Sequence, residues 1–119
     1  MMEFKEYLED WFGDETEEVG LYMAMARQAE REGYPEIARQ FRENAMAEAE
    51  HAGIAAELAG MVGDTEENLK KMTEGEGDAN EGRMKWAEKR EGEEKAYLIT
   101  TAKDEARHQK ALKGLKDRL

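Results

Sequence analysis

Two Glu-x-x-His pairs contain the only two histidines of this chain: Glu48 with His51, and Glu105 with His108. Residues i and i+3 of a helix project from the same face, so each pair offers one carboxylate and one imidazole to a common point. Carboxylate and imidazole together suit Fe(II), with Mn(II) as an alternative. Two such pairs on separate helices, each joined by a further glutamate, are the ligand set of a di-metal site in a four-helix bundle.

The composition favours a single helical domain that does not bind nucleic acid. Proline occurs once in 119 residues, and alanine, glutamate, lysine, methionine and leucine dominate, which predicts helix and no sheet. The net charge of −11 argues against nucleic acid or an anionic membrane surface as a partner. Cysteine is absent, so disulfides and thiolate metal sites are excluded. The chain begins without a basic segment followed by an apolar run, so we expect a cytoplasmic protein.

The elements that must position these residues are a short N-terminal helix at 3–12 and two helical hairpins. Asp14 is predicted to cap the first long helix, which stops at Gly33, and the second helix opens at Pro35. A capping box at 64–67 opens the third helix, which is expected to close near Gly92. The predicted domain is therefore 1–119, with hairpins at 14–61 and 65–118.

A carboxylate interrupts the apolar face of each long helix. Glu48 lies among Phe41, Ala45 and Ala52, and the other helices follow the same pattern with Glu15, Glu76 and Glu105. A buried carboxylate is costly unless it is paired or bound to a metal. Four carboxylates converging on two imidazoles would repel one another strongly, and two divalent cations would relieve that repulsion.

A metal-free interpretation stays open because acidic residues are abundant in this chain, at 29 Asp and Glu. Most glutamates are expected to lie on solvated helix faces. A lone histidine on an apolar face is more often a core residue than a ligand. The metal interpretation is favoured because both histidines lie on apolar faces, each with its own glutamate, in pseudo-equivalent helices. The alternative is a metal-free helical interaction module.

Several segments of the chain resemble the rubrerythrin family. They are Asp14-Glu15-Thr16 with Tyr22 downstream, the stretches around both Glu-x-x-His pairs at 47–52 and 103–108, and the runs 66–69 and 74–76. The resemblance implies an all-α, ferritin-like four-helix bundle with two irons. It implies one imidazole for each iron, a hydrogen-bonding role for Tyr22, and carboxylate ligands that are terminal or bridging. The implied imidazoles are His51 and His108, the terminal carboxylates Glu15 and Glu76, and the bridging carboxylates Glu48 and Glu105.

The resemblance also implies an activity and partners. We expect a peroxidase that reduces hydrogen peroxide to water, because two ferrous ions can deliver two electrons together. Rubrerythrins carry a rubredoxin domain that feeds electrons to the irons, and a chain without cysteine would need an external electron-transfer protein such as a rubredoxin. The alternative activity is a ferroxidase or iron-handling role with O₂ as the oxidant.

Two features depart from the family pattern. Ala79 stands where rubrerythrins have a further glutamate, one turn after the ligand in the third helix, so an exchange of histidine for carboxylate at one iron is not expected. Three glycines, Gly75, Gly77 and Gly82, are expected to weaken the third helix around Glu76.

The connection between the second and third helices predicts a dimer. If Glu48 and Glu76 share one level of a ferritin-like bundle, the chain must return about 38 Å, whereas the links through Val62 and Gly63 reach only about 10 Å. One chain cannot close that bundle. We therefore expect a homodimer in which two chains exchange hairpins, with a simple up-down-up-down bundle as the alternative.

Overall fold

The computed structural model describes residues 2–119, which contain four α-helices and no strand. The helices are α1 (Phe4–Arg31), α2 (Pro35–Leu58), α3 (Thr65–Ala87) and α4 (Gly92–Asp117). The predicted all-α class is confirmed and is consistent with a ferritin-like helical bundle. Met1, with which the predicted domain begins, lies outside the described residues.

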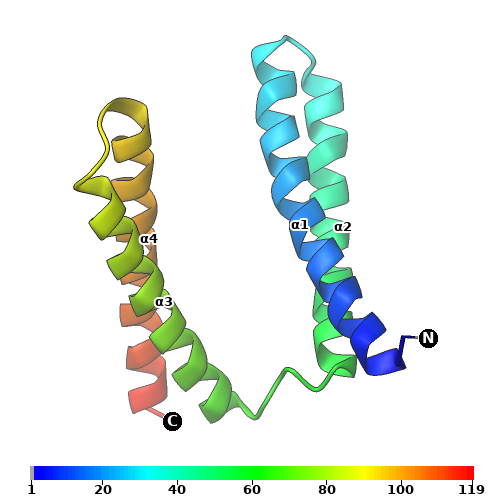
Figure 1. Ribbon diagram of the computed structural model, residues 1–119, viewed down its shortest axis with the longest axis vertical. Coiled ribbons are helices and arrows are strands. Elements are labelled where there is room, and N and C mark those ends of the chain that lie inside the picture. Colours follow the sequence, from blue (N-terminus) through cyan, green and yellow to red (C-terminus); the bar gives the residue numbers. More distant parts are fainter. Residues whose placement is uncertain (1) are drawn as a thin grey trace. The chain divides into compact units, whose positions relative to one another are not determined.

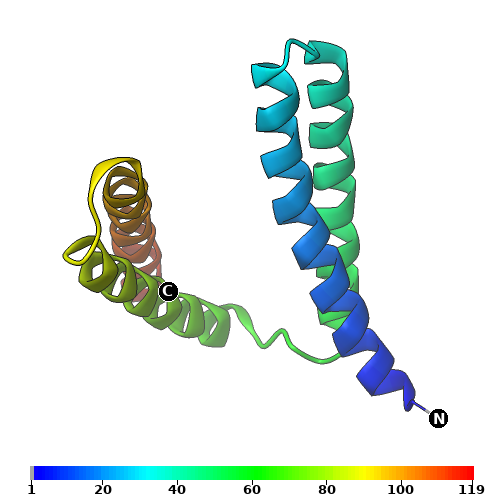
Figure 2. The same cartoon turned by 45° about the horizontal axis from the view of Figure 1, so that its top comes forward.

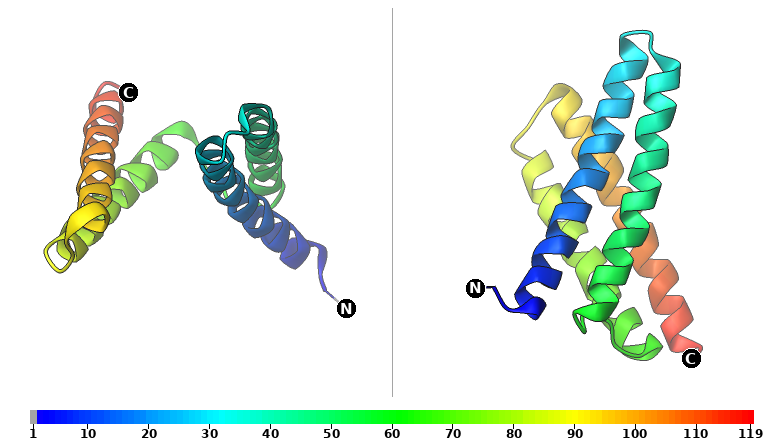
Figure 3. Two further views of the ribbon diagram at one scale, coloured as in Figure 1. Left: turned by 90° about the horizontal axis from the view of Figure 1, so that it is seen from above. Right: turned by 90° about the vertical axis from the view of Figure 1, so that its right-hand side faces the viewer.

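The helices form two compact units, one ending at Val62 and the other comprising Gly63–Leu119. In the first unit α1 packs against α2, and in the second α3 packs against α4. Each unit is a hairpin of two antiparallel helices, as the views in Figure 1, Figure 2 and Figure 3 show. The division between the units falls between the two predicted hairpins.

Glycines end the first two helices with the same hydrogen-bond pattern. After α1, the Tyr34 N–H donates to the Ala29 carbonyl at 2.8 Å, and Gly33 has a φ of 85°. After α2, Met61 donates to Ala56 at 3.0 Å around Gly60, whose φ is 74°. This is the Schellman arrangement, which needs a left-handed residue and therefore favours glycine.

The predicted start of α3 is confirmed, and its predicted end is wrong. The Asp64 carboxylate accepts the Glu67 N–H at 2.8 Å, and the Glu67 carboxylate accepts the Asp64 N–H, which completes a capping box. However, α3 ends at Ala87, five residues before Gly92. With a φ of 64°, Gly92 is instead the first residue of α4.

The separate N-terminal helix at 3–12 is also contradicted, because α1 continues without a break from Phe4 to Arg31. Asp14 does not cap a new helix. The Thr16 hydroxyl donates to the carbonyl of Phe12 at 2.8 Å and of Gly13 at 3.0 Å, inside the continuous helix. A glycine within a helix costs only about 1 kcal/mol, which the uninterrupted hydrogen-bond ladder on both sides outweighs.

Most of the buried residues of the described chain are alanines. Ala26, Ala29 and Ala38 form a buried cluster with Phe41 packed against it. Small side chains let the backbones of two helices approach closely. Among residues 2–119 no large side chain is completely buried, and many large apolar side chains of both hairpins remain exposed in the single chain.

None of the four helices within residues 2–119 combines the length and the apolar character needed to cross a lipid bilayer.

The continuity of α1 can be tested with Gly13→Ala. Nothing lies within 4 Å of a Cβ built at this position, so alanine should raise the free energy of unfolding by about 0.5–1 kcal/mol in a helix interior. The measurement is urea unfolding at one fixed protein concentration. Gly33→Ala is the control: its left-handed backbone should make the same substitution destabilising by about 1–2 kcal/mol. A Gly13→Ala variant less stable than the wild type would contradict the continuous helix.

Candidate metal centre

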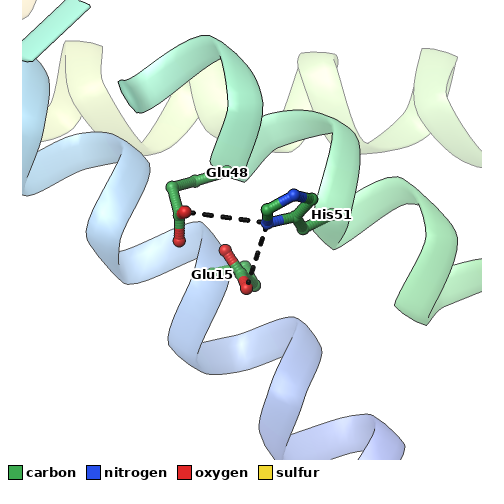
Figure 4. Close-up of side chains that lie close together, drawn as sticks. All are labelled: Glu15, Glu48 and His51. Atoms are coloured by element: carbon green, nitrogen blue, oxygen red, sulfur yellow. Dashed lines mark ion pairs between the residues drawn. The ribbon is translucent and has the colours of Figure 1, made fainter. Parts of the chain in front are cut away.

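The first hairpin gathers three predicted ligands at one point. Glu15 projects from α1, and Glu48 and His51 project from α2 toward it, as Figure 4 shows. One ligand atom from each lies within 4.8 Å of the other two. Nδ1 of His51 is 3.6 Å from Oε1 of Glu15 and 3.6 Å from Oε1 of Glu48. These distances exceed the length of a normal hydrogen bond, so the three side chains face a common point without a close hydrogen bond from His51 to either carboxylate.

Trp11 holds one oxygen of Glu15. Its indole N–H donates to Oε1 at 2.9 Å from one turn earlier in α1. The Glu15 side chain is only 13% exposed, and its second oxygen, Oε2, is buried and has no hydrogen-bond partner. A buried carboxylate oxygen without a partner is unusual in a native protein, and a bound cation is one way of satisfying it.

The crowding of carboxylates perturbs the titration of this cluster. Hydrogen bonding with Glu15 and Glu18, together with their negative charge and partial burial, raises the pKa of Glu48 to about 7. The same contact with Glu48, aided by Trp11 and His51, lowers the pKa of Glu15. One proton shared between two close carboxyl groups explains the opposite directions.

The second hairpin does not bring its three predicted ligands together. Nδ1 of His108 lies 3.4 Å from Oε1 of Glu76. Glu105 instead pairs with Arg83, whose Nε is 3.1 Å from its Oε1. Oε2 of Glu105 is buried and has no hydrogen-bond partner. Within residues 2–119, the first hairpin therefore holds the one group of three converging metal-ligand side chains.

α3 is continuous from Thr65 to Ala87 despite its three glycines, and the expected weakening around Glu76 stays a prediction. Gly77 serves the close packing of α3 on α4. A Cβ at Gly77 would lie 2.3 Å from Nε2 of Gln109, the neighbour of His108 in sequence. One turn further along, the Asn80 amide donates to the Ala102 carbonyl of α4 at 2.6 Å.

Tyr22 lies against Phe41, with the ring centroids 5.9 Å apart. It is partly buried on the face of α1 that also carries Glu15, seven residues earlier. Its hydrogen bond to the metal-site carboxylates stays a prediction.

The sequence interpretation missed three residues that touch the predicted ligands. Trp11 was assigned only to an apolar stripe, yet its spacing of four residues from Glu15 was visible in the sequence. Glu18 lies three residues from Glu15 on α1 and reaches Glu48 of α2. Arg83 lies two turns after Glu76, but its partner Glu105 comes from the other helix of the hairpin.

The donor set fits divalent iron or manganese. Carboxylate oxygen and imidazole nitrogen are ligands that Fe(II) and Mn(II) accept. Buried, partnerless oxygens on Glu15 and Glu105 leave one acceptor atom in each hairpin for such a cation.

Comparison with known proteins adds an independent observation. The family model for rubrerythrin matches residues 6–116. An uncharacterised protein of Methanocaldococcus jannaschii is 45% identical over 112 residues, which cover 90% of this chain and 79% of that protein. Reverse rubrerythrin-1 of Clostridium acetobutylicum is 44% identical over 113 residues, which cover 90% of this chain and 62% of that protein.

The raised pKa of Glu48 predicts a pH-dependent loss of stability in the metal-free protein. Between the ordinary glutamate pKa of 4.5 and about 7, the native state retains a proton that the unfolded state has lost. The free energy of unfolding should therefore fall as pH rises through this window. The lowered pKa of Glu15 acts in the opposite sense, below pH 4.5.

Urea unfolding of chelator-treated protein between pH 4.5 and 7.5 measures this effect. Glu48→Gln should flatten the dependence, whereas Glu57→Gln, at an exposed position of the same helix, should leave it unchanged. An equal slope in wild type and Glu48→Gln would contradict the assignment.

Proposed function

Because the chain belongs to the rubrerythrin family, we propose that it is a di-iron peroxidase that reduces hydrogen peroxide to water with electrons from an external donor. Family membership suggests a di-iron protein of the oxidative-stress type. The observations that carry the proposal are the convergence of Glu15, Glu48 and His51 and a buried oxygen of Glu15 that has no hydrogen-bond partner.

The proposed ligand set combines residues from the first and the second hairpin. Each hairpin contributes two carboxylates and one imidazole, which matches two metal ions with one imidazole each. The bridging role assigned to Glu48 and Glu105, and the terminal role of Glu15 and Glu76, stay proposals. The six ligands are Glu15, Glu48, His51, Glu76, Glu105 and His108.

When bound, two ferrous ions supply the two electrons that convert hydrogen peroxide and two protons into two water molecules. The chain's own residues prepare the site for this reaction. The Trp11 indole fixes Oε1 of Glu15 and leaves Oε2 free to face a cation. The proposed role of Tyr22 is to donate a hydrogen bond at the edge of the site, on the same face of α1.

The electrons must reach the site from outside these 119 residues, because the chain has no cysteine to hold a rubredoxin-type iron. The proposed donor is a separate electron-transfer protein of the rubredoxin kind. A cytoplasmic location also stays a prediction.

We also propose that the protein acts as a homodimer in which two chains exchange hairpins. In the single chain the large apolar side chains that flank the alanine interfaces are exposed by about half. Leu21, Met25 and Ile37 on the first hairpin and Met72 and Leu115 on the second are 46–51% exposed. Helical hairpins with open apolar faces gain stability by packing against one another.

Anaerobic loading with Fe(II), followed by desalting and iron analysis, tests the metal site. We expect about two irons per chain for the wild type, and at least a tenfold loss of retained iron for Glu48→Ala, as removal of a ligand should cause. Glu57→Ala, an exposed change on the same helix, should retain the wild-type amount.

Stopped-flow mixing of the loaded protein then separates the activities. Faster oxidation by hydrogen peroxide than by O₂ supports the peroxidase. Faster reaction with O₂, with iron uptake continuing beyond two per chain, would identify a ferroxidase. Absence of retained iron in the wild type would leave a metal-free interaction module.

Complementation between two inactive variants tests the exchange of hairpins. In an exchanged dimer, one site combines the first hairpin of one chain with the second hairpin of its partner. A mixed dimer of Glu48→Ala and Glu105→Ala chains therefore contains one site with both substitutions and one site with neither.

After the two variants are unfolded, mixed and refolded together, random pairing should restore about a quarter of the wild-type iron. Each variant refolded alone is the control and should retain almost none. No recovery in the mixture, with the dimer confirmed by light scattering, would show that each chain builds its sites from its own hairpins.

A further inference from the structure

In the second hairpin Glu105 pairs with Arg83 and not with the other two predicted ligands. Nε of Arg83 lies 3.1 Å from Oε1 of Glu105, while Glu76 and His108 form a pair of their own at 3.4 Å. The equivalent residues of the first hairpin converge as a group of three. The two hairpins thus hold similar residues in different arrangements.

The position of Arg83 follows from helix geometry. It lies seven residues, or two turns, after Glu76 on the same face of α3. Because α4 runs antiparallel to α3 (Figure 1), Arg83 meets α4 on the N-terminal side of His108, where Glu105 projects.

The pairing with Arg83 uses only one of the two carboxylate oxygens of Glu105. Arg83 holds Oε1, and Oε2 is buried without a partner. A carboxylate that bridges two metal ions needs both oxygens, so a bridging Glu105 has to release Arg83. The Arg83 side chain is 44% exposed, whereas Glu105 is 16% exposed, so the arginine can move into solvent at low cost while the carboxylate stays in place.

The first hairpin holds its carboxylate differently. The group on Oε1 of Glu15 is the uncharged indole N–H of Trp11, which does not repel an incoming cation. A guanidinium is permanently charged, so its attraction to Glu105 competes directly with that of a metal ion.

We propose that Arg83 is a displaceable counter-ion, a positioning residue that holds Glu105 away from Glu76 and His108 and competes with a metal ion for it. The inference rests on the proposed di-metal site. Metal binding at this hairpin then requires the exchange of one cation, the guanidinium, for another.

Co(II) titration of the full-length protein by calorimetry tests the proposal, with the visible absorption of bound cobalt as a second signal. Arg83→Gln and Arg83→Met, which remove the charge, should tighten the weaker cobalt site about two- to fivefold, the scale of one partly exposed ion pair. Arg83→Lys keeps the charge and should bind cobalt much as the wild type does. Arg90→Gln is the matched control, because Arg90 is 47% exposed and pairs with Glu94 at 2.9 Å.

Thermal unfolding of the metal-free variants supplies the readout that distinguishes a counter-ion from a structural support. Loss of Arg83 should lower the melting temperature, because Glu105 is left without its partner, while it tightens cobalt binding. If Arg83 were purely a structural support, its loss would lower the melting temperature and also weaken cobalt binding.

Unchanged or weaker cobalt binding in both Arg83→Gln and Arg83→Met, with a wild type that binds two cobalt ions, would overturn the proposal for Arg83 alone. A wild type that binds no cobalt would overturn it together with the di-metal site.

Discussion

The repulsion between carboxylates placed on partly buried helix faces is the constraint on which the rest of this structure depends. Water stabilises these groups less on a partly buried face than in solution, and an unpaired buried charge costs several kcal/mol. The chain compensates each one differently. Glu15 accepts a hydrogen bond from Trp11, the pKa of Glu48 is raised to about 7 by the neighbouring carboxylates, and Glu105 pairs with Arg83. A divalent cation would take the place of the proton on Glu48 and of Arg83 at Glu105, while Trp11 would keep its hydrogen bond to Glu15.

Close helix packing makes this crowding unavoidable. Alanines such as Ala26 and Ala38 bring α1 against α2, and Gly77 leaves room for Gln109 between α3 and α4. The same choice of small residues limits what each hairpin buries by itself, so large apolar side chains remain exposed in the single chain. The close packing that positions the site and the exposure of the large apolar side chains therefore have a common origin.

The two hairpins also differ in how far their ligands are arranged in advance. Glu15, Glu48 and His51 are gathered, with a neutral donor on one oxygen, so a cation would find them close to their places. The second hairpin holds equivalent residues but commits one carboxylate to a fixed positive charge. The two hairpins repeat the same ligand types in sequence, but they differ chemically because the residues that contact those ligands differ.

The sequence by itself determined the four long helices, the turn at Gly33 and the capping box at Asp64, because hydrophobic period, capping and backbone freedom are local properties. It also predicted glutamates and histidines on the inner faces. The four glutamates are 13–21% exposed there, whereas the side chains of His51 and His108 are 49% and 58% exposed in the single chain. The sequence was misleading at Gly13 and Asp14, where a local stop was available but the hydrogen bonds of the longer helix outweighed it. Only the tertiary structure decided which of these groups meet. The pairing of Arg83 with Glu105 depends on the register of two antiparallel helices and on side-chain rotamers, and neither is encoded in the spacing along one helix.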